Sequence, residues 1–226
     1  MDTSVELVEK EEQESVMDQK YKMTISLNVL KHLGINLYSS VPAVLTEAVA
    51  NSWDADANHV KITVDDSDGS IIILDDGDGM TLEDVNNRFL EVGHDRRENG
   101  YCETSSGRKV MGRKGLGKLS LFSIAQTIEI YTKKDNEEHA FVLDYTKIVE
   151  AIEGKLEGDY HPEPIPFNPP TKIDGDGTLI HVKDLKKQRK TSANILKRSL
   201  ARRFSVIGEA NEFIVTVNGD NVDPSD

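Results

Sequence analysis

Three polar side chains stand at helical spacing in an alanine-rich, largely apolar segment, residues 41–57. Glu47 and Asn51 lie four residues apart and Asp54 follows three residues later, so a helix places all three on one face. Pro42 is typical of the first turn of such a helix. Burying these groups without partners is costly. Asn51 and Asp54 either cap the helix or face water, as polar side chains commonly do, or they line a ligand site together with Glu47.

A second polar group follows an apolar run, residues 70–74, which predicts a buried strand that ends at Asp75. Gly77 and Gly79 allow positive φ angles and let the backbone approach a ligand closely. A carboxylate at this position suits the amino group of adenine, and such a pocket discriminates against bases that lack the donor. The alternative is an ordinary Asp-Gly turn. Similar turns occur at residues 65–69 and 174–177, and none of the three fits a calcium loop.

A glycine-rich segment, Gly112 to Lys118, runs into an apolar stretch that predicts a helix through Ala125. Glycine-rich loops at helix starts bind phosphate through backbone N–H groups and the helix dipole. Gly112, Gly117 and Lys118 have the spacing of a P-loop, but Leu119 stands where that loop needs a hydroxyl for magnesium. The preceding residues are polar and not a hydrophobic strand, so we reject a P-loop. Together, the segments 47–51 and 75–80 supply the polar parts of a nucleotide–magnesium pocket.

In chain order, these motifs and the later segment 177–182 resemble the GHKL ATPases: gyrase B, heat-shock chaperones, histidine kinases and MutL. The resemblance covers roughly residues 23–218 and looks closest to the chaperone, MutL and microrchidia branches, which hydrolyse ATP within a dimer. It implies the Bergerat fold, ATP and Mg²⁺ as cofactors, and a nucleotide-dependent homodimer of the full-length protein.

The resemblance also implies a role for each matching position. Glu47 would be the general base for the attacking water, Asn51 the magnesium ligand, and Asp75 the acceptor for the adenine amino group. A histidine kinase does not need a water base at the position of Glu47, so the glutamate favours hydrolysis. Further contacts are implied with the base at Gly77, Gly79, Met80 and Thr178, with the phosphates at Gly112, Gly115, Leu116, Gly117 and Lys118, and near the nucleotide at Asp54.

The segment between the two glycine motifs, residues 91–117, occupies the place of the family's ATP lid. Its composition suits a segment that is mobile when empty and ordered over a polyphosphate, although a solvated basic loop has the same composition. Equal proteolytic cleavage with and without a nonhydrolysable ATP analogue would exclude a lid. The basic side chains concerned are Arg96, Arg97, Arg108, Lys109, Arg113 and Lys114.

The composition, 226 residues with 37% hydrophobic side chains, suits one globular domain with a substantial core. A single cysteine, Cys102, excludes an internal disulfide, and with no signal peptide or long apolar run we expect a cytoplasmic protein without membrane contact. The six histidines have no zinc spacing. We predict a two-layer α/β sandwich, a mixed sheet covered on one face by helices.

Charge is unevenly distributed along the chain. The net charge of −13 argues against a protein that coats nucleic acid. Residues 1–20 hold seven acids against two lysines and predict a flexible arm, whereas residues 21–226 form the ATP-binding domain. Residues 183–203 hold nine basic side chains and one acid; this stretch could contact DNA, an acidic partner or only water.

The predicted elements are short helices at 25–33 and 82–90, a hairpin from 60–64 to 71–74, strands at 127–132, 140–145, 178–182 and 213–217, and a helix at 192–203. The proline-rich residues 160–170 are predicted to be a connector without regular sheet.

Two functions remain open: an ATPase whose hydrolysis resets a dimeric clamp, and a nucleotide-gated interaction module that rarely cleaves ATP. Glu47 favours the enzyme. A histidine kinase ranks third, because no preceding helix carries a phospho-accepting histidine. The chain is expected to be an N-terminal fragment, without the next domain that supplies a γ-phosphate lysine in several relatives, so we expect slow or negligible turnover. The client is not specified: chromosome maintenance, repair, chaperoning and antiviral defence all use this ATPase.

Overall fold

The computed structural model describes residues 21–25, 40–65, 67, 69–92, 103–112, 117–152, 160–186 and 191–223. Within these ranges one eight-stranded sheet has the order β10-β9-β2-β3-β8-β5-β6-β7. Its neighbours are antiparallel except β2 and β9, which are parallel, so the sheet is mixed. The strands are β2 (His59–Asp65), β3 (Ser70–Asp75), β5 (Ala125–Lys134), β6 (Glu137–Asp144), β7 (Glu163–Pro164), β8 (Gly177–Leu185), β9 (Ile214–Val217) and β10 (Asp220–Asn221). Separately, β1 (Thr24–Ile25) pairs in parallel with β4 (Glu91–Val92).

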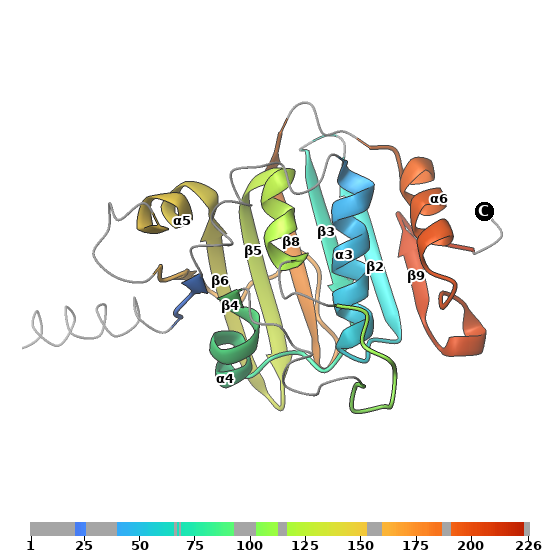
Figure 1. Cartoon of the computed structure of the whole chain (residues 1–226), viewed down its shortest axis with the longest axis horizontal. Helices are drawn as coiled ribbons and strands as arrows, with labels where there is room; N and C mark the ends of the chain where they lie inside the picture. Colours follow the sequence, from blue (N-terminus) through green and yellow to red (C-terminus); the bar gives the residue numbers. More distant parts are fainter. Residues whose placement is uncertain are drawn as a thin grey trace, which may run out of the picture.

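Helices cover one face of this sheet, and α3 lies over β2 and β3 (Figure 1). The α-helices are α3 (Val41–Asp54), α4 (Leu82–Asp84), α5 (Tyr145–Ile152) and α6 (Ala193–Arg203). A π-helical turn, η1 (Val85–Phe89), extends α4, and two 3₁₀ helices are η2 (Gly117–Ser123) and η3 (Glu209–Asn211). The predicted two-layer α/β sandwich is therefore confirmed.

The main core lies between the helices and the sheet. Leu45 and Val49 of α3 are fully buried in the same cluster as Ile62 of β2 and Ile73 of β3. Because side chains alternate along a strand, Tyr131 and Leu179 point to the other face, where they form a smaller cluster. This second cluster is completed by Ala140 and Ile173, with Phe167 packed against it.

Most predicted elements are confirmed, because long apolar alternation is the strongest local signal for a strand. The hairpin β2–β3, the strands β5, β6, β8 and β9, and the helix α6 all form where they were expected, with small differences in their ends. The helix predicted over 41–57 ends at Asp54, and the one predicted over 82–90 divides into α4 and η1. None of the helices in the described ranges has the length and apolar character needed to cross a membrane.

Four predictions were wrong in detail. The helix predicted after the glycine loop forms as the 3₁₀ helix η2 but ends at Ser123, and Ala125 already begins β5, since this run fills the space between α3 and the sheet. Residues 160–170 include the two-residue edge strand β7, where proline is tolerated because an edge strand leaves one side unpaired. Tyr145, expected in a strand, starts α5, and Ile25, expected in a helix, ends β1.

Several predictions concern residues that lie outside the described ranges. They are the acidic arm over 1–20, the helix over 26–33, and the parts of the lid at 93–102 and 113–116.

The basic stretch over 183–203 is not one helix. It begins in β8, where Lys183 pairs with Glu129 at 2.8 Å, and it ends in α6.

Candidate functional site

Helix α3 carries the three polar residues on its less buried side. The chain enters the helix from Ser40, which is extended with φ of −147°, and Pro42 lies in the first turn, where its missing N–H is not needed. Glu47, Asn51 and Asp54 are all partly buried. The opposite side of the helix packs into the core through Val44, Leu45, Ala48 and Val49.

Both described ends of the glycine-rich segment lie against this polar side. A Cβ on Gly117 would lie 3.1 Å from Glu47 Oε2 and 3.7 Å from Asn51 Nδ2. A Cβ on Gly112 would lie 2.8 Å from Asp54 Oδ2 and 4.0 Å from Asn51 Oδ1. The backbone can approach the three polar groups so closely because both positions lack a side chain. Of the remaining predicted phosphate contacts, Lys118 lies in η2, and Gly115 and Leu116 lie outside the described residues.

Asp75 ends β3 as a buried carboxylate with a strongly shifted pKa. Ser52 Oγ of α3 donates to its Oδ2 at 2.9 Å, and the Gly77 N–H donates to its Oδ1 at 3.1 Å. Burial raises the pKa of Asp75 to about 6, although hydrogen bonds from Ser52, Gly77 and the Thr178 backbone oppose the rise. A carboxylate offers roughly four acceptor positions, so Asp75 keeps capacity for one more donor.

The glycines around Asp75 are required by packing within the protein. Gly79 has φ of +62°, and a Cβ there would overlap the carbonyl oxygen of Lys133 in β5. A Cβ on Gly77 would lie 2.6 Å from the Ala55 carbonyl oxygen. These contacts hold the turn after β3 against both the end of α3 and β5, which fixes the path of the chain after Asp75.

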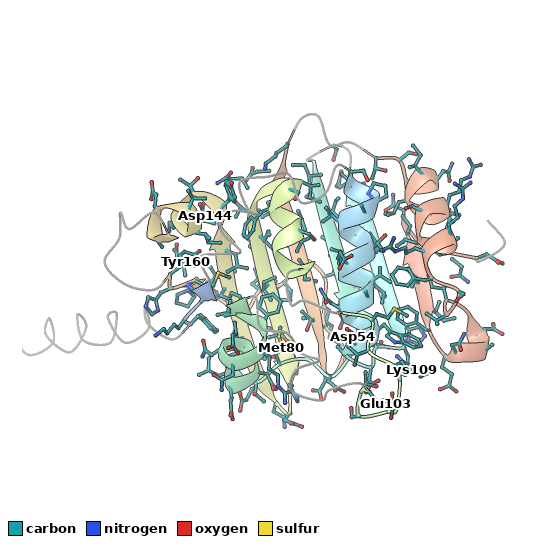
Figure 2. All side chains as sticks on the ribbon, viewed as in Figure 1. Asp54, Met80, Glu103, Lys109, Asp144 and Tyr160 are labelled. Carbon is teal, nitrogen blue, oxygen red and sulfur yellow. The ribbon has the colours of Figure 1, made fainter. Side chains whose placement is uncertain are left out.

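Thr178 and Met80, which the resemblance assigns to the base end of the site, lie near this turn. Thr178 of β8 is the register partner of Asp75, and its Oγ1 lies 3.1 Å from the buried Thr132 Oγ1. Met80 is partly buried against the main core. Figure 2 shows Met80 and Asp54 at the same end of the sheet, so residues that the resemblance assigns to the base and to the nucleotide lie at one end of the domain.

The described part of the predicted lid, residues 103–112, is bound to the end of α3. The Met111 and Gly112 N–H groups donate to Asp54 at 2.7 and 2.8 Å. Figure 2 shows Lys109 and Glu103 on the loop beside Asp54. Arg108 donates to the protein's own Ala57 carbonyl oxygen at 2.6 Å. Residues 103–112 are therefore held against the end of α3, and the closure of the 91–117 segment over a nucleotide stays a prediction.

Sequence reasoning missed two contributors to this site. Ser52 follows Asn51 directly and therefore points to a different side of α3, toward Asp75, which only the packing of α3 on β3 reveals. Asp56 follows Asp54 and binds the serine-rich turn of 103–112. The hydroxyl-rich Thr-Ser-Ser sequence before Gly107 was the available signal, since such residues commonly bond to nearby carboxylates or backbone in turns.

Comparison with known proteins identifies related sequences. The family model for histidine kinase-, DNA gyrase B-, and HSP90-like ATPase matches residues 38–176. This chain is 37% identical over 209 residues to "Putative type II restriction enzyme HgiDII" of Herpetosiphon aurantiacus, covering 92% of this chain and 33% of that protein.

Two other relatives come from different functional groups. The chaperone protein HtpG of Oceanobacillus iheyensis is 26% identical over 120 residues, 50% of this chain and 19% of the chaperone. The DNA mismatch repair protein MutL of Clostridium botulinum is 31% identical over 97 residues, 42% of this chain and 14% of MutL. The chain thus spans about a third or less of the curated relatives that it matches.

Proposed function

This chain belongs to the family of histidine kinase-, DNA gyrase B- and HSP90-like ATPases, and we propose that it binds ATP with Mg²⁺ and hydrolyses it. The observation that carries the proposal is the convergence of two glycine positions and three polar residues on one side of α3, next to the buried Asp75. The relatives differ widely in function, so the family assignment supports nucleotide chemistry and does not specify what that chemistry drives.

At the base end, Asp75 would accept the amino group of adenine. Its buried carboxylate is held by donors from Ser52 and Gly77 and has room for a further donor. A ligand N–H is favourable there because burial alone disfavours the charged form, as the raised pKa of Asp75 indicates. Bases without that donor would leave the carboxylate unsatisfied, which accounts for selectivity toward adenine.

At the phosphate end, Asn51 would bind magnesium and Glu47 would act on the attacking water. Asn51 offers an uncharged oxygen of the kind that Mg²⁺ accepts alongside phosphate and water ligands, so the residues present fit the ion. Magnesium, when bound, would neutralise phosphate charge. Glu47, whose Oε2 lies 3.1 Å from a Cβ position on Gly117, would orient the attacking water and accept its proton. Gly112 and Gly117 would leave room for backbone N–H groups near the phosphates.

Isothermal titration with ATP and magnesium, together with phosphate release, tests this assignment. We expect binding by the wild-type chain, loss of binding in Asp75→Asn, and loss of phosphate release with binding retained in Glu47→Ala. If wild type binds no adenine nucleotide, the assignment is wrong. If it binds ATP but Glu47→Ala changes nothing, the domain is a nucleotide-gated module with little hydrolysis.

We further propose that ATP hydrolysis by this domain is coupled to an action on DNA. The supporting observation is the 37% identity, along 92% of this chain, to the Herpetosiphon protein whose name describes a restriction enzyme. The matching experiment uses the full-length protein: plasmid cleavage with and without ATP, for wild type and Glu47→Ala. Cleavage that depends on ATP and on Glu47 would support the proposal, and cleavage indifferent to both, or no cleavage, would contradict it.

A further inference from the structure

Asp56 holds the loop 103–112 from a backbone position that is unfavourable for most residues. It follows α3 with φ of +57°, in the left-handed region that residues other than glycine, asparagine and aspartate rarely adopt. This conformation directs its carboxylate at the loop. The carboxylate accepts from Thr104 Oγ1 at 2.5 Å, Ser105 Oγ at 2.7 Å and the Ser106 N–H at 2.9 Å, and from the Ser106 hydroxyl as well.

Arg108 fixes the other side of the same loop. Its guanidinium donates to the Ala57 carbonyl oxygen at 2.6 Å and to Asn58 Oδ1 at 2.7 Å, and lies 4.6 Å from the centre of the Trp53 ring. The Trp53 indole N–H in turn donates to the Lys109 carbonyl oxygen at 3.0 Å. The turn, closed by the pairing of residue 103 with residue 109, is thus attached at several points to the end of α3.

The attached loop leads directly into the phosphate side of the site. Three residues after Lys109, the Gly112 N–H binds Asp54, and a Cβ on Gly112 would lie 4.0 Å from Asn51 Oδ1. Asp54 holds Gly112 directly, and the loop that Asp56 restrains leads the backbone to this contact beside Asn51. A segment already held in its bound arrangement loses less conformational entropy when a ligand binds.

We propose that Asp56 is a positioning residue for ATP: by holding 104–106, it pre-orders the backbone that reaches Gly112 and so raises affinity for the nucleotide. This inference rests on the proposed ATP binding. Asp56 does not contact the reacting atoms. Glu47 and Asn51 are held by α3 itself, so loss of Asp56 should weaken binding and leave the chemical step almost unchanged.

The test compares Asp56→Gly and Asp56→Asn with wild type. Glycine accepts the φ of +57° without strain and removes the carboxylate, whereas asparagine tolerates the same φ and keeps one acceptor oxygen. We expect a Kd for ATP with magnesium about tenfold higher in Asp56→Gly and about threefold higher in Asp56→Asn, with kcat for phosphate release within about twofold of wild type. A raised KM with constant kcat separates positioning from general damage.

Asp144→Asn is the matched control. Asp144 also accepts backbone N–H groups, from Thr146 at 2.8 Å and Lys147 at 3.1 Å, but it lies beside α5, away from Asp54 (Figure 2). Its Kd for ATP should equal that of wild type. An Asp56→Gly variant with unchanged Kd overturns the inference, as does one whose kcat falls as much as its affinity.

Trypsin supplies a second measurement that needs no nucleotide. Arg108 is only 14% exposed in its side chain, so cleavage after it should be slow in wild type and faster in Asp56→Gly. Faster cleavage with unchanged Kd would mean that Asp56 fixes the loop without aiding ATP, which contradicts the inference. If wild type binds no ATP, the proposed function fails and the inference with it, whatever the trypsin result.

Discussion

Asp75 and Asp56 both lie near the end of α3, and the fold shifts the pKa values of their carboxyl groups in opposite directions. Burial raises the pKa of Asp75 to about 6, against donors from Ser52, Gly77 and Thr178. Partial burial also tends to raise the pKa of Asp56, but hydrogen bonds from Ser106, Thr104 and Ser105 outweigh it and lower the pKa to about 2. A carboxylate that the fold leaves short of donors is suited to a ligand, and one that the fold satisfies is suited to holding a loop.

The largest expected effect is that of Asp75→Asn, which should lower ATP affinity without lowering the free energy of unfolding. Keeping this carboxylate ionised in the folded protein at pH 7.5 costs about 3 kcal/mol, from the rise of its pKa from 3.8 to about 6. Asp75→Asn should therefore lose at least about 100-fold in ATP affinity while its free energy of unfolding stays equal or rises by up to about 3 kcal/mol. Titration calorimetry and urea unfolding at pH 7.5 measure the two quantities.

Asp56→Asn is the opposite member of this pair and should lose stability. Its ionised form is favoured by the fold, so removing the charge weakens hydrogen bonds that are already made. If Asp75→Asn is clearly less stable than wild type, or if Asp56→Asn is more stable, the contrast between a ligand carboxylate and a structural carboxylate is wrong.

The pH dependence of the two carboxylates provides the next test. The folded pKa of Asp75, about 6, lies above its unfolded value of 3.8, so its contribution to stability is greatest below about pH 3.8 and is lost as pH rises through 6. The difference in unfolding free energy between wild type and Asp75→Asn should accordingly shift in favour of wild type as pH falls from 7.5 to 4.5. ATP affinity should fall over the same range, by up to about tenfold per pH unit, because protonated Asp75 accepts less well.

Asp56 should show no such change over that range. Its folded pKa of about 2 lies below the unfolded value of 3.8, so its stabilising contribution is fully present above about pH 4 and is lost only as pH falls toward 2. Cleavage by a protease active from pH 4.5 to 8 should show constant protection of residues 103–112. Loss of protection near pH 6 would mean that Asp56, and not Asp75, is the carboxylate that titrates near pH 6.

The contrast also marks what the sequence could reveal. The strand before Asp75 and the helix that carries Glu47 follow from apolar periodicity, which is a local property, and both were predicted near their observed bounds. The bond from Ser52 to Asp75 joins two elements, and nothing in the sequence near either residue specifies it. The bonds from Asp56 to 104–106 span about fifty positions of the chain; the hydroxyl-rich Thr-Ser-Ser sequence signals a turn but does not specify Asp56 as its partner.

A serine-to-alanine change at this bond should have an intermediate effect. Ser52→Ala removes the donor to Asp75 Oδ2, so the pKa of Asp75 should rise further and less of the carboxylate should be ionised at pH 7. We expect a Kd for ATP roughly threefold to tenfold higher, with the midpoint of its pH dependence moved upward. Thr46→Val is the control on the same helix, because the Thr46 hydroxyl bonds only to the Pro42 carbonyl oxygen among the described contacts. Equal affinities in the two variants would remove Ser52 from the site.

The smallest expected effect lies on the loop side, at Arg108. Arg108→Lys keeps the positive charge but replaces the two nitrogens that donate separately to Ala57 and Asn58 with one, and an ammonium covers the Trp53 ring less well than a planar guanidinium. We expect about 1 kcal/mol less stability and a Kd for ATP about twofold higher, since Asp56 still holds 104–106. Arg202→Lys, on the exposed side of α6, should change neither value. A larger loss of affinity in Arg108→Lys than in Asp56→Gly would mean that the arginine, and not the carboxylate, determines where the loop meets Asn51.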